Sequence, residues 1–359
     1  MNVSRLLETT NFLLNLDNLH EISIKINELI VALSNLSGNP SDQNFQNTFQ
    51  SSMQNLNLKF GQLQKNIEPQ KQKYIKEIAG SEFFLDNFPK QFSLNVSESP
   101  AAPASALSKI TTFNQRRQEY IGRLQGIQSS LQGLGFKEID IDHGEAEIGF
   151  LIPRDLFKNN LNGLIAELRE VRIIIQAFAE IETGSGAEII VRDISTSDPQ
   201  FFFSIDVKTI ACIASAITWG LATWKQVEEI KKLRLENEKS TAISDKTNLL
   251  KIYDEMIGEK IDRAVDEKLN EMLASVKNNN GRKNEQEKHL RYALESILSR
   301  LESGMTIELR ALPPPKEQGA EDPKKQQAFS EINEAKKQLK FPSIQGSPTK
   351  QIPYQKGTE

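Results

Sequence analysis

Three histidines and one acidic cluster are the residues of this chain most suited to binding a metal ion. His20, His143 and His289 lie far apart in the sequence, and none stands at a metal-ligand spacing. His143 is flanked by acidic residues that would suit a weak divalent-cation site; they are Asp140, Asp142, Glu145 and Glu147. A polar hairpin tip with solvated carboxylates is the simpler interpretation, so we predict no metal site.

The single cysteine, Cys212, is the other residue that could carry chemistry. A cysteine acts as a nucleophile only beside a base and with some exposure. Cys212 lies in the apolar run Val207–Trp224, so we expect a buried and inert thiol. One cysteine also excludes an internal disulfide framework and a multi-cysteine zinc site. Together with the lack of a recognisable signal peptide, this favours the cytoplasm.

Sequence signatures of common enzymes are missing from the chain. It contains no GxxxxGK[ST], GxGxxG, HExxH or GxSxG motif, and Gly184-Ser185-Gly186 is better explained as a helix C-cap. The formal net charge is −4, and acidic residues interrupt the basic cluster at 282–291. We therefore expect no catalytic residue, no cofactor and no nucleic-acid partner.

The elements that must position any functional residue are organised around Val207–Trp224, the longest apolar run. Asp206 can cap a helix there, but only sixteen uncharged residues separate Lys208 from Lys225. A membrane span needs roughly twenty predominantly apolar residues. We expect a helix buried by protein, with an interfacial or inserting helix as the alternative. The residues that would pack against protein or lipid are Ile210, Ile213, Ile217, Trp219, Gly220 and Trp224.

The chain before this helix shows two different periodicities. Apolar residues at steps of three and four predict helices over 1–37, 42–79 and 106–133, with a shorter helix after Ser81. From Gly135 the pattern predicts strands at 137–142, 146–152, 187–195 and 200–205, and a helix at 161–181. This order describes a small antiparallel sheet covered by one helix on one face, to which 305–312 could add a strand.

After Trp224 the sequence becomes a charged helix, and a further amphipathic helix is expected over 245–277. Its apolar residues recur at steps of four and would form a seam between copies of the chain: Leu249, Tyr253, Ile257, Ile261, Val265 and Leu269. Long apolar stripes of this kind motivate a homo-oligomer. Another helix is expected at 283–302. Pro313-Pro314-Pro315 begins a polar segment that we predict to be disordered.

Residues 188–235 and 281–312 carry a resemblance to known sequences; with the three prolines that follow it, the second range reads GRKNEQEKHLRYALESILSRLESGMTIELRALPPP. They are similar to uncharacterised bacterial proteins that couple a small α+β module to a short apolar helix and a charged helix. Related architectures occur as effector or effector-associated components of bacterial conflict systems. The resemblance implies an architecture, and an association with such systems is the role it suggests.

We predict a mainly α (α+β) fold in which blocks of long helices, as bundles or coiled coils, flank a small antiparallel-sheet module with a central apolar helix. The predicted segments are 1–98 (helical bundle), 99–135 (linker and helix), 136–205 (α+β module), 206–240 (apolar then charged helix), 241–303 (helices), 304–312 (strand) and 313–359 (tail). The predicted function is a non-enzymatic, self-assembling interaction protein of the cytoplasm. The alternative is a membrane-associated or membrane-perturbing effector that acts through residues 207–224.

Overall fold

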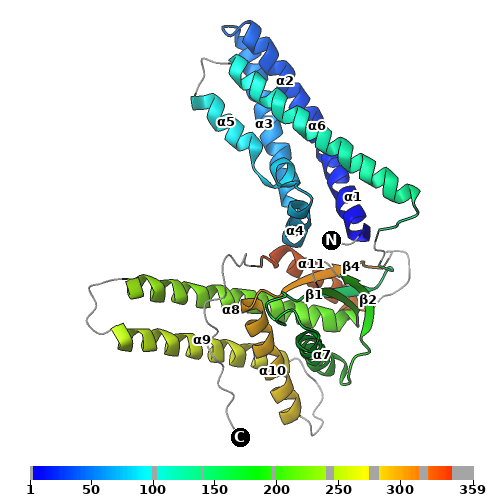
Figure 1. The fold of residues 1–359 in the computed structure, drawn as a ribbon, viewed down its shortest axis with the longest axis vertical. Helices are drawn as coiled ribbons and strands as arrows, with labels where there is room; N and C mark the ends of the chain where they lie inside the picture. The colour runs from blue at the N-terminus through cyan, green and yellow to red at the C-terminus, as the bar shows by residue number, and fades with distance from the viewer. Residues whose placement is uncertain are drawn as a thin grey trace. The chain divides into compact units, whose positions relative to one another are not determined.

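Helices make up most of the chain, as predicted, and a small antiparallel sheet completes the fold (Figure 1). The computed structural model describes residues 3–98, 103–138, 141–195, 199–239, 246–274, 283–314 and 322–341. The chain divides into two units, Met1–Asp140 and Ile141–Glu359, each with its own hydrophobic core. The expected fold class, mainly α with a small sheet module and a central apolar helix, is confirmed.

The first unit begins with two helices where the sequence predicts one. Helix α1 spans Val3–His20 and α2 spans Ile22–Gly38, and Glu21 between them adopts a left-handed conformation with φ of 56°. Polar side chains meet at this break. Ser23 Oγ donates to Asp17 Oδ2 at 2.8 Å, and Arg117 binds both residues. The apolar periodicity continues across Glu21, so it does not reveal the break.

The expected helix over 42–79 is also divided. Asp42 caps α3 (Gln43–Lys65) by accepting hydrogen bonds from the amides of Asn44 and Phe45. A second helix, α4 (Pro69–Glu77), then starts with Pro69 at its first position, where a proline needs no amide partner. The unit continues with the π-helix η1 (Ser81–Leu85), α5 (Phe88–Glu98) and α6 (Pro103–Gly133).

The sheet of the second unit has four antiparallel strands among the described residues. These are β1 (Ala146–Leu151), β2 (Ile190–Ser195), β3 (Gln200–Ser204) and β4 (Thr306–Ala311), in the spatial order β2-β3-β1-β4. The C-terminal strand β4 pairs with β1 along its whole length, with Ile148 opposite Leu309. The sheet is therefore completed by a segment more than a hundred residues away in sequence.

The prediction of a strand at 137–142 is wrong for the residues of this segment that the structure describes. Residues 136–138 and 141–142 have no regular structure, and 139–140 lie outside the described residues. Strand β4 occupies the place beside β1, where Gly144 N donates to Leu312 O at 2.8 Å and Leu312 N donates to Glu145 O at 3.1 Å. The 137–142 segment offers only two apolar side chains, whereas β4 buries Ile307 and Leu309 in the core.

Helices cover the apolar face of the sheet. They are α8 (Val207–Lys239) against β1, α11 (Pro323–Gln338) against β4, and α7 (Leu161–Thr183), which faces β2 and β3. Helix α10 (Lys283–Glu302) packs on α7 and α8. Asp206 caps α8 as predicted, accepting from the amides of Lys208 at 2.9 Å and Thr209 at 3.2 Å. Helix α9 (Lys246–Ala274) runs beside α8 (Figure 1). The segments 136–205, 206–240, 241–303 and 304–312 contribute to one hydrophobic core.

Helix α11 corrects the prediction that residues 313–359 are disordered. Residues 323–338 form a helix with Pro323 in its first turn, and Asp322 caps it by accepting from Lys324 N at 3.0 Å. Phe329, Ile332 and Leu339 are buried in the core of the second unit, against α8 and β4. The sequence prediction missed this helix because the segment is mostly polar. Its few apolar residues are nevertheless spaced so that they lie on one face of a helix. Residues 315–321 and 342–359 lie outside the described residues.

Candidate functional site

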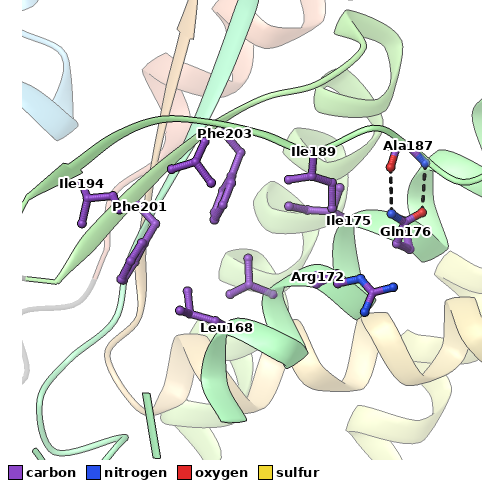
Figure 2. Close-up of a pocket in the computed structure, with 11 residues that line it drawn as sticks. Leu168, Arg172, Ile175, Gln176, Ala187, Ile189, Ile194, Phe201 and Phe203 are labelled. Carbon is purple, nitrogen blue, oxygen red and sulfur yellow. Dashed lines mark hydrogen bonds between the residues drawn. The ribbon is translucent and has the colours of Figure 1, made fainter. Parts of the chain in front are cut away.

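An open pocket of about 520 Å³ lies between α7 and the strands β2 and β3. Its walls are formed by side chains from three places (Figure 2): Leu168, Val171, Arg172, Ile175 and Gln176 of α7; Ala187 and Ile189 before β2; and Val191, Ile194, Phe201 and Phe203 of the strands. The lining is apolar except for Arg172 and Gln176. A pocket of this size and character suits an apolar group of a ligand or partner.

The loop at one end of the pocket is fixed by the side chain of Gln176. Its amide Nε2 donates to the carbonyl of Ala187 at 2.8 Å, and its Oε1 accepts from the amide of Ala187 at 2.9 Å (Figure 2). Gly184, with φ of 74°, ends α7 and starts this loop, as the sequence predicts for a C-cap. Gly186 is packed closely, because a Cβ there would lie 2.7 Å from Gln176 Oε1. Gln176 is therefore the residue that positions the loop.

Strand β2 forms one edge of the sheet and exposes apolar side chains. Among the described strands it pairs only with β3, through the pairs Val191–Phe203 and Ile194–Phe201. The exposed fractions are 53% for Val191 and 51% for Ile194. A bulge at Arg192 interrupts the pairing between Val191 and Asp193. An exposed edge with apolar residues offers backbone groups and apolar surface to another chain.

The opposite face of the sheet carries a network of charged residues. Arg310 Nε lies 3.2 Å from Glu308 Oε1, and its Nη1 lies 3.6 Å from Glu147 Oε2. The Arg310 guanidinium also lies 4.5 Å from the centre of the Phe202 ring. That ring covers Gly149, where a Cβ would come within 2.3 Å of it. An arginine that contacts both carboxylates in this way is typical of a structural ion network.

Two of the acidic residues near His143, Glu145 and Glu147, form ion pairs with other parts of the second unit. His143 Nδ1 lies 3.0 Å from the carbonyl oxygen of Pro313, and Glu145 forms an ion pair of 2.7 Å with Arg192. Glu147 contacts Arg310, and Asp140 lies outside the described residues. In the described part of the chain, no group of three or more His, Cys, Asp or Glu side chains is arranged to hold a metal ion.

The two remaining histidines and Cys212 lie in separate surroundings. His20 Nε2 is 2.9 Å from Asn66 Nδ2, and His289 Nδ1 is 3.7 Å from Glu180 Oε2. Burial raises the pKa of the Cys212 thiol well above its ordinary range, and the nearby Glu182 carboxylate raises it further. A thiol that holds its proton so strongly is a poor nucleophile.

The apolar part of α8 is packed mainly against protein of the second unit. Ile210, Ile213 and Ile217 are fully buried, whereas Trp219 and Trp224 are half-buried. Gly220 faces α10, where a Cβ would lie 3.0 Å from Leu301 Cδ1 and 3.4 Å from Ile297 Cγ2. Val207–Glu236 is long and apolar enough to cross a membrane, with a mean hydropathy of 1.2 in its apolar window, and 61% of that window is buried.

The predicted oligomer seam on α9 faces other helices of the same chain over much of its length. Ile257, Val265 and Leu269 are buried. Tyr253 and Ile261 are half-buried, and the side chain of Leu249 lies outside the described residues. Helix α9 contacts α8 and α10, and Lys268 Nζ on α9 donates to Ser215 Oγ on α8 at 3.0 Å. Ile257, Val265 and Leu269 are therefore covered within the chain itself and are not available as a seam between copies.

Sequence reasoning did not identify the pocket or the exposed edge. A signal was present in the run Ile189-Ile190-Val191, which places apolar residues on both faces of a strand instead of one. The pocket also needs α7, whose distance from β2 depends on tertiary packing. Comparison with known protein families, curated proteins and solved structures finds no match to this chain.

Proposed function

We propose that this chain is a non-enzymatic interaction protein that self-assembles through the hairpin formed by α8 and α9. Four large apolar side chains on this hairpin are exposed to solvent, and we call them the hairpin patch: Leu233 (51%), Leu235 (42%), Ile252 (50%) and Met256 (46%). Ile252 and Met256 stand four residues apart and share one face of α9, whereas Leu233 and Leu235, two residues apart, point to opposite sides of α8. The exposed apolar face that carries Ile252 and Met256 supports the proposal, because such surface is a common mark of a protein interface.

An ion pair between α8 and α9 shows that the patch residues of the two helices lie at the same height along the hairpin. Arg234 Nε on α8 lies 3.0 Å from Asp254 Oδ1 on α9. Leu233 and Leu235 flank the arginine, while Ile252 and Met256 lie two residues from the aspartate. The face of α9 that carries Ile252 and Met256 can pack against a second copy, as helices do in a bundle.

The test is the mass of the full chain in solution. We expect the wild-type protein to form a homo-oligomer, and we expect Ile252→Asp combined with Met256→Asp to dissociate it, since both side chains are exposed and their replacement leaves the core intact. Val31→Asp on α2, where the side chain is 60% exposed, is the matched control. A monomeric wild-type protein, or a folded variant with unchanged mass, would contradict the proposal.

The length and hydropathy of α8 favour a second candidate function, that of a membrane-perturbing effector of a bacterial conflict system. In this proposal the apolar half of α8 leaves its core position and inserts into a bilayer. Removal from the core would expose Ile210, Ile213 and Ile217, so insertion requires a large rearrangement of the second unit. Mass photometry with and without liposomes separates the two candidates. A protein that remains soluble and oligomeric beside liposomes supports the first, and stable association with the vesicles supports the second.

A further inference from the structure

We infer that the edge of β2 and the adjoining pocket bind a short extended peptide of a partner protein, one that carries apolar side chains at alternate positions and an acidic side chain. The peptide would lie alongside β2 as an added strand. Its apolar side chains would cover the pocket, and its carboxylate would approach Arg172. This site is distinct from the hairpin patch and does not depend on self-assembly.

The first observation is the position of the pocket relative to the edge of the sheet. Val191 and Ile194 belong to the edge strand, lie opposite Phe203 and Phe201, and line the pocket with them. Neighbouring strands lie about 4.8 Å apart, so a strand added beside β2 would place every second side chain over the same pocket. Backbone pairing would supply affinity, and the pocket would supply selectivity for apolar residues.

The second observation is the charge of the lining. Arg172 is the only charged residue among those that line the pocket, and it is exposed. Within the described part of the chain it forms no ion pair. Figure 2 shows its guanidinium near Gln176, turned away from Leu168 and Phe201. The acidic side chain of the peptide is therefore expected at the Gln176 end, where it can form a charge-assisted hydrogen bond with Arg172.

The bulge at Arg192 limits the length of the paired segment. A bulge bends its strand and disturbs the regular ladder, which protects an edge against indefinite pairing with other strands. Strand β2 spans only Ile190–Ser195. These features favour a short peptide over a long strand or a continuous sheet formed by many copies.

The experiment is selection of phage-displayed random heptapeptides on the full-length protein, followed by fluorescence anisotropy with the enriched peptides. We expect enriched sequences to alternate apolar and polar residues and to contain aspartate or glutamate. Arg172→Glu should weaken binding of an acidic peptide by about tenfold or more, and should favour the version with lysine in place of the acid. Arg169→Glu is the matched control, because Arg169 is an exposed arginine of α7 outside the pocket lining.

Two further measurements distinguish an added strand from other occupants. Methylation of alternate backbone amides of the peptide should abolish binding for one set of positions and spare the other. Ile194→Arg should remove peptide binding without changing the mass of the protein in solution.

Four results would overturn the inference: no enriched peptide, unchanged affinity in Arg172→Glu, equal binding of both methylated peptides, or a changed mass in Ile194→Arg. The last would identify a second copy as the occupant. A hairpin-patch variant that no longer self-assembles but still binds the peptide would support this inference, because it would show that the peptide site does not depend on self-assembly.

Discussion

Gly220 of α8 lies directly against Leu301 of α10, so that a Cβ at position 220 would be 3.0 Å from Leu301 Cδ1. Ile297 and Leu298 of α10 approach the same point, at 3.4 and 3.7 Å. The absence of a side chain at Gly220 thus allows the apolar helix to approach α10 closely. This contact couples the central helix to the core of the second unit.

Gly220→Leu should therefore destabilise the protein by about 1–3 kcal/mol, because a leucine overpacks this contact. The measurement is the free energy of unfolding from urea titration, with Ala222→Leu as a control at an exposed position of the same helix. In a helix that faces lipid, the same substitution would raise hydropathy and favour insertion. A variant as stable as wild type that binds liposomes more strongly would contradict the buried packing of α8.

Helix α11 should be required for the stability of the second unit. Ile332 is fully buried in its core, so Ile332→Ala should cost about 2–5 kcal/mol through lost burial and the cavity left behind. Ser330→Ala, at an exposed position of the same helix, should change stability by no more than about 0.5 kcal/mol. Thermal and urea unfolding of both variants measure the difference. Equal stability of Ile332→Ala and wild type would show that α11 does not hold the core together.

Much of the fold could be predicted from apolar periodicity, and the exceptions have identifiable physical reasons. Periodicity correctly located α7, β1, β3 and α8 because each buries one clear face or an entire apolar segment. It did not reveal the break at Glu21, where the apolar pattern continues and the break is accompanied by side chains distant in sequence, above all Arg117. It also overlooked α11, whose polar residues outnumber its few buried ones.

The candidate site was harder to predict than the fold. Its lining comes from α7, β2 and β3, and no short motif joins them. Whether Val191 and Ile194 are covered depends on which strand lies at the edge of the sheet, and that order was set by β4 pairing with β1 at the other side. Tertiary pairing between distant segments therefore decides which apolar residues remain exposed.

The buried ion pair between Arg117 and Asp17 should be important for the stability of the first unit, because removal of one partner leaves the charge of the other buried and unpaired. The Arg117 side chain is fully buried, and its Nη2 lies 2.5 Å from Asp17 Oδ1. Arg117→Met should cost about 3–5 kcal/mol by leaving the Asp17 carboxylate without its cation. The double variant Arg117→Met and Asp17→Leu should recover part of that loss. Urea unfolding of the single and double variants provides the comparison, and a double variant less stable than the single one would contradict this account.

His20 should make the first unit less stable at acidic pH. Burial lowers the pKa of His20 below its ordinary value of 6.5, and the nearby Lys59 cation lowers it further. Well above pH 6.5 the imidazole is neutral in both the folded and the unfolded chain, so protonation of His20 takes nothing from the free energy of unfolding. As the pH falls through that value, the unfolded chain takes up a proton first and stability is lost, until the folded imidazole is protonated as well.

The test compares wild type with His20→Gln between about pH 8 and about pH 5. Glutamine preserves a polar partner for Asn66, whose Nδ2 lies 2.9 Å from His20 Nε2, but it does not titrate. The difference in unfolding free energy between the two proteins should change with pH in the direction that favours the variant at low pH. Because carboxylates titrate in both proteins, their contribution cancels in this difference. A difference independent of pH, or one that grows in favour of wild type on acidification, would show that the folded chain does not depress the pKa of His20.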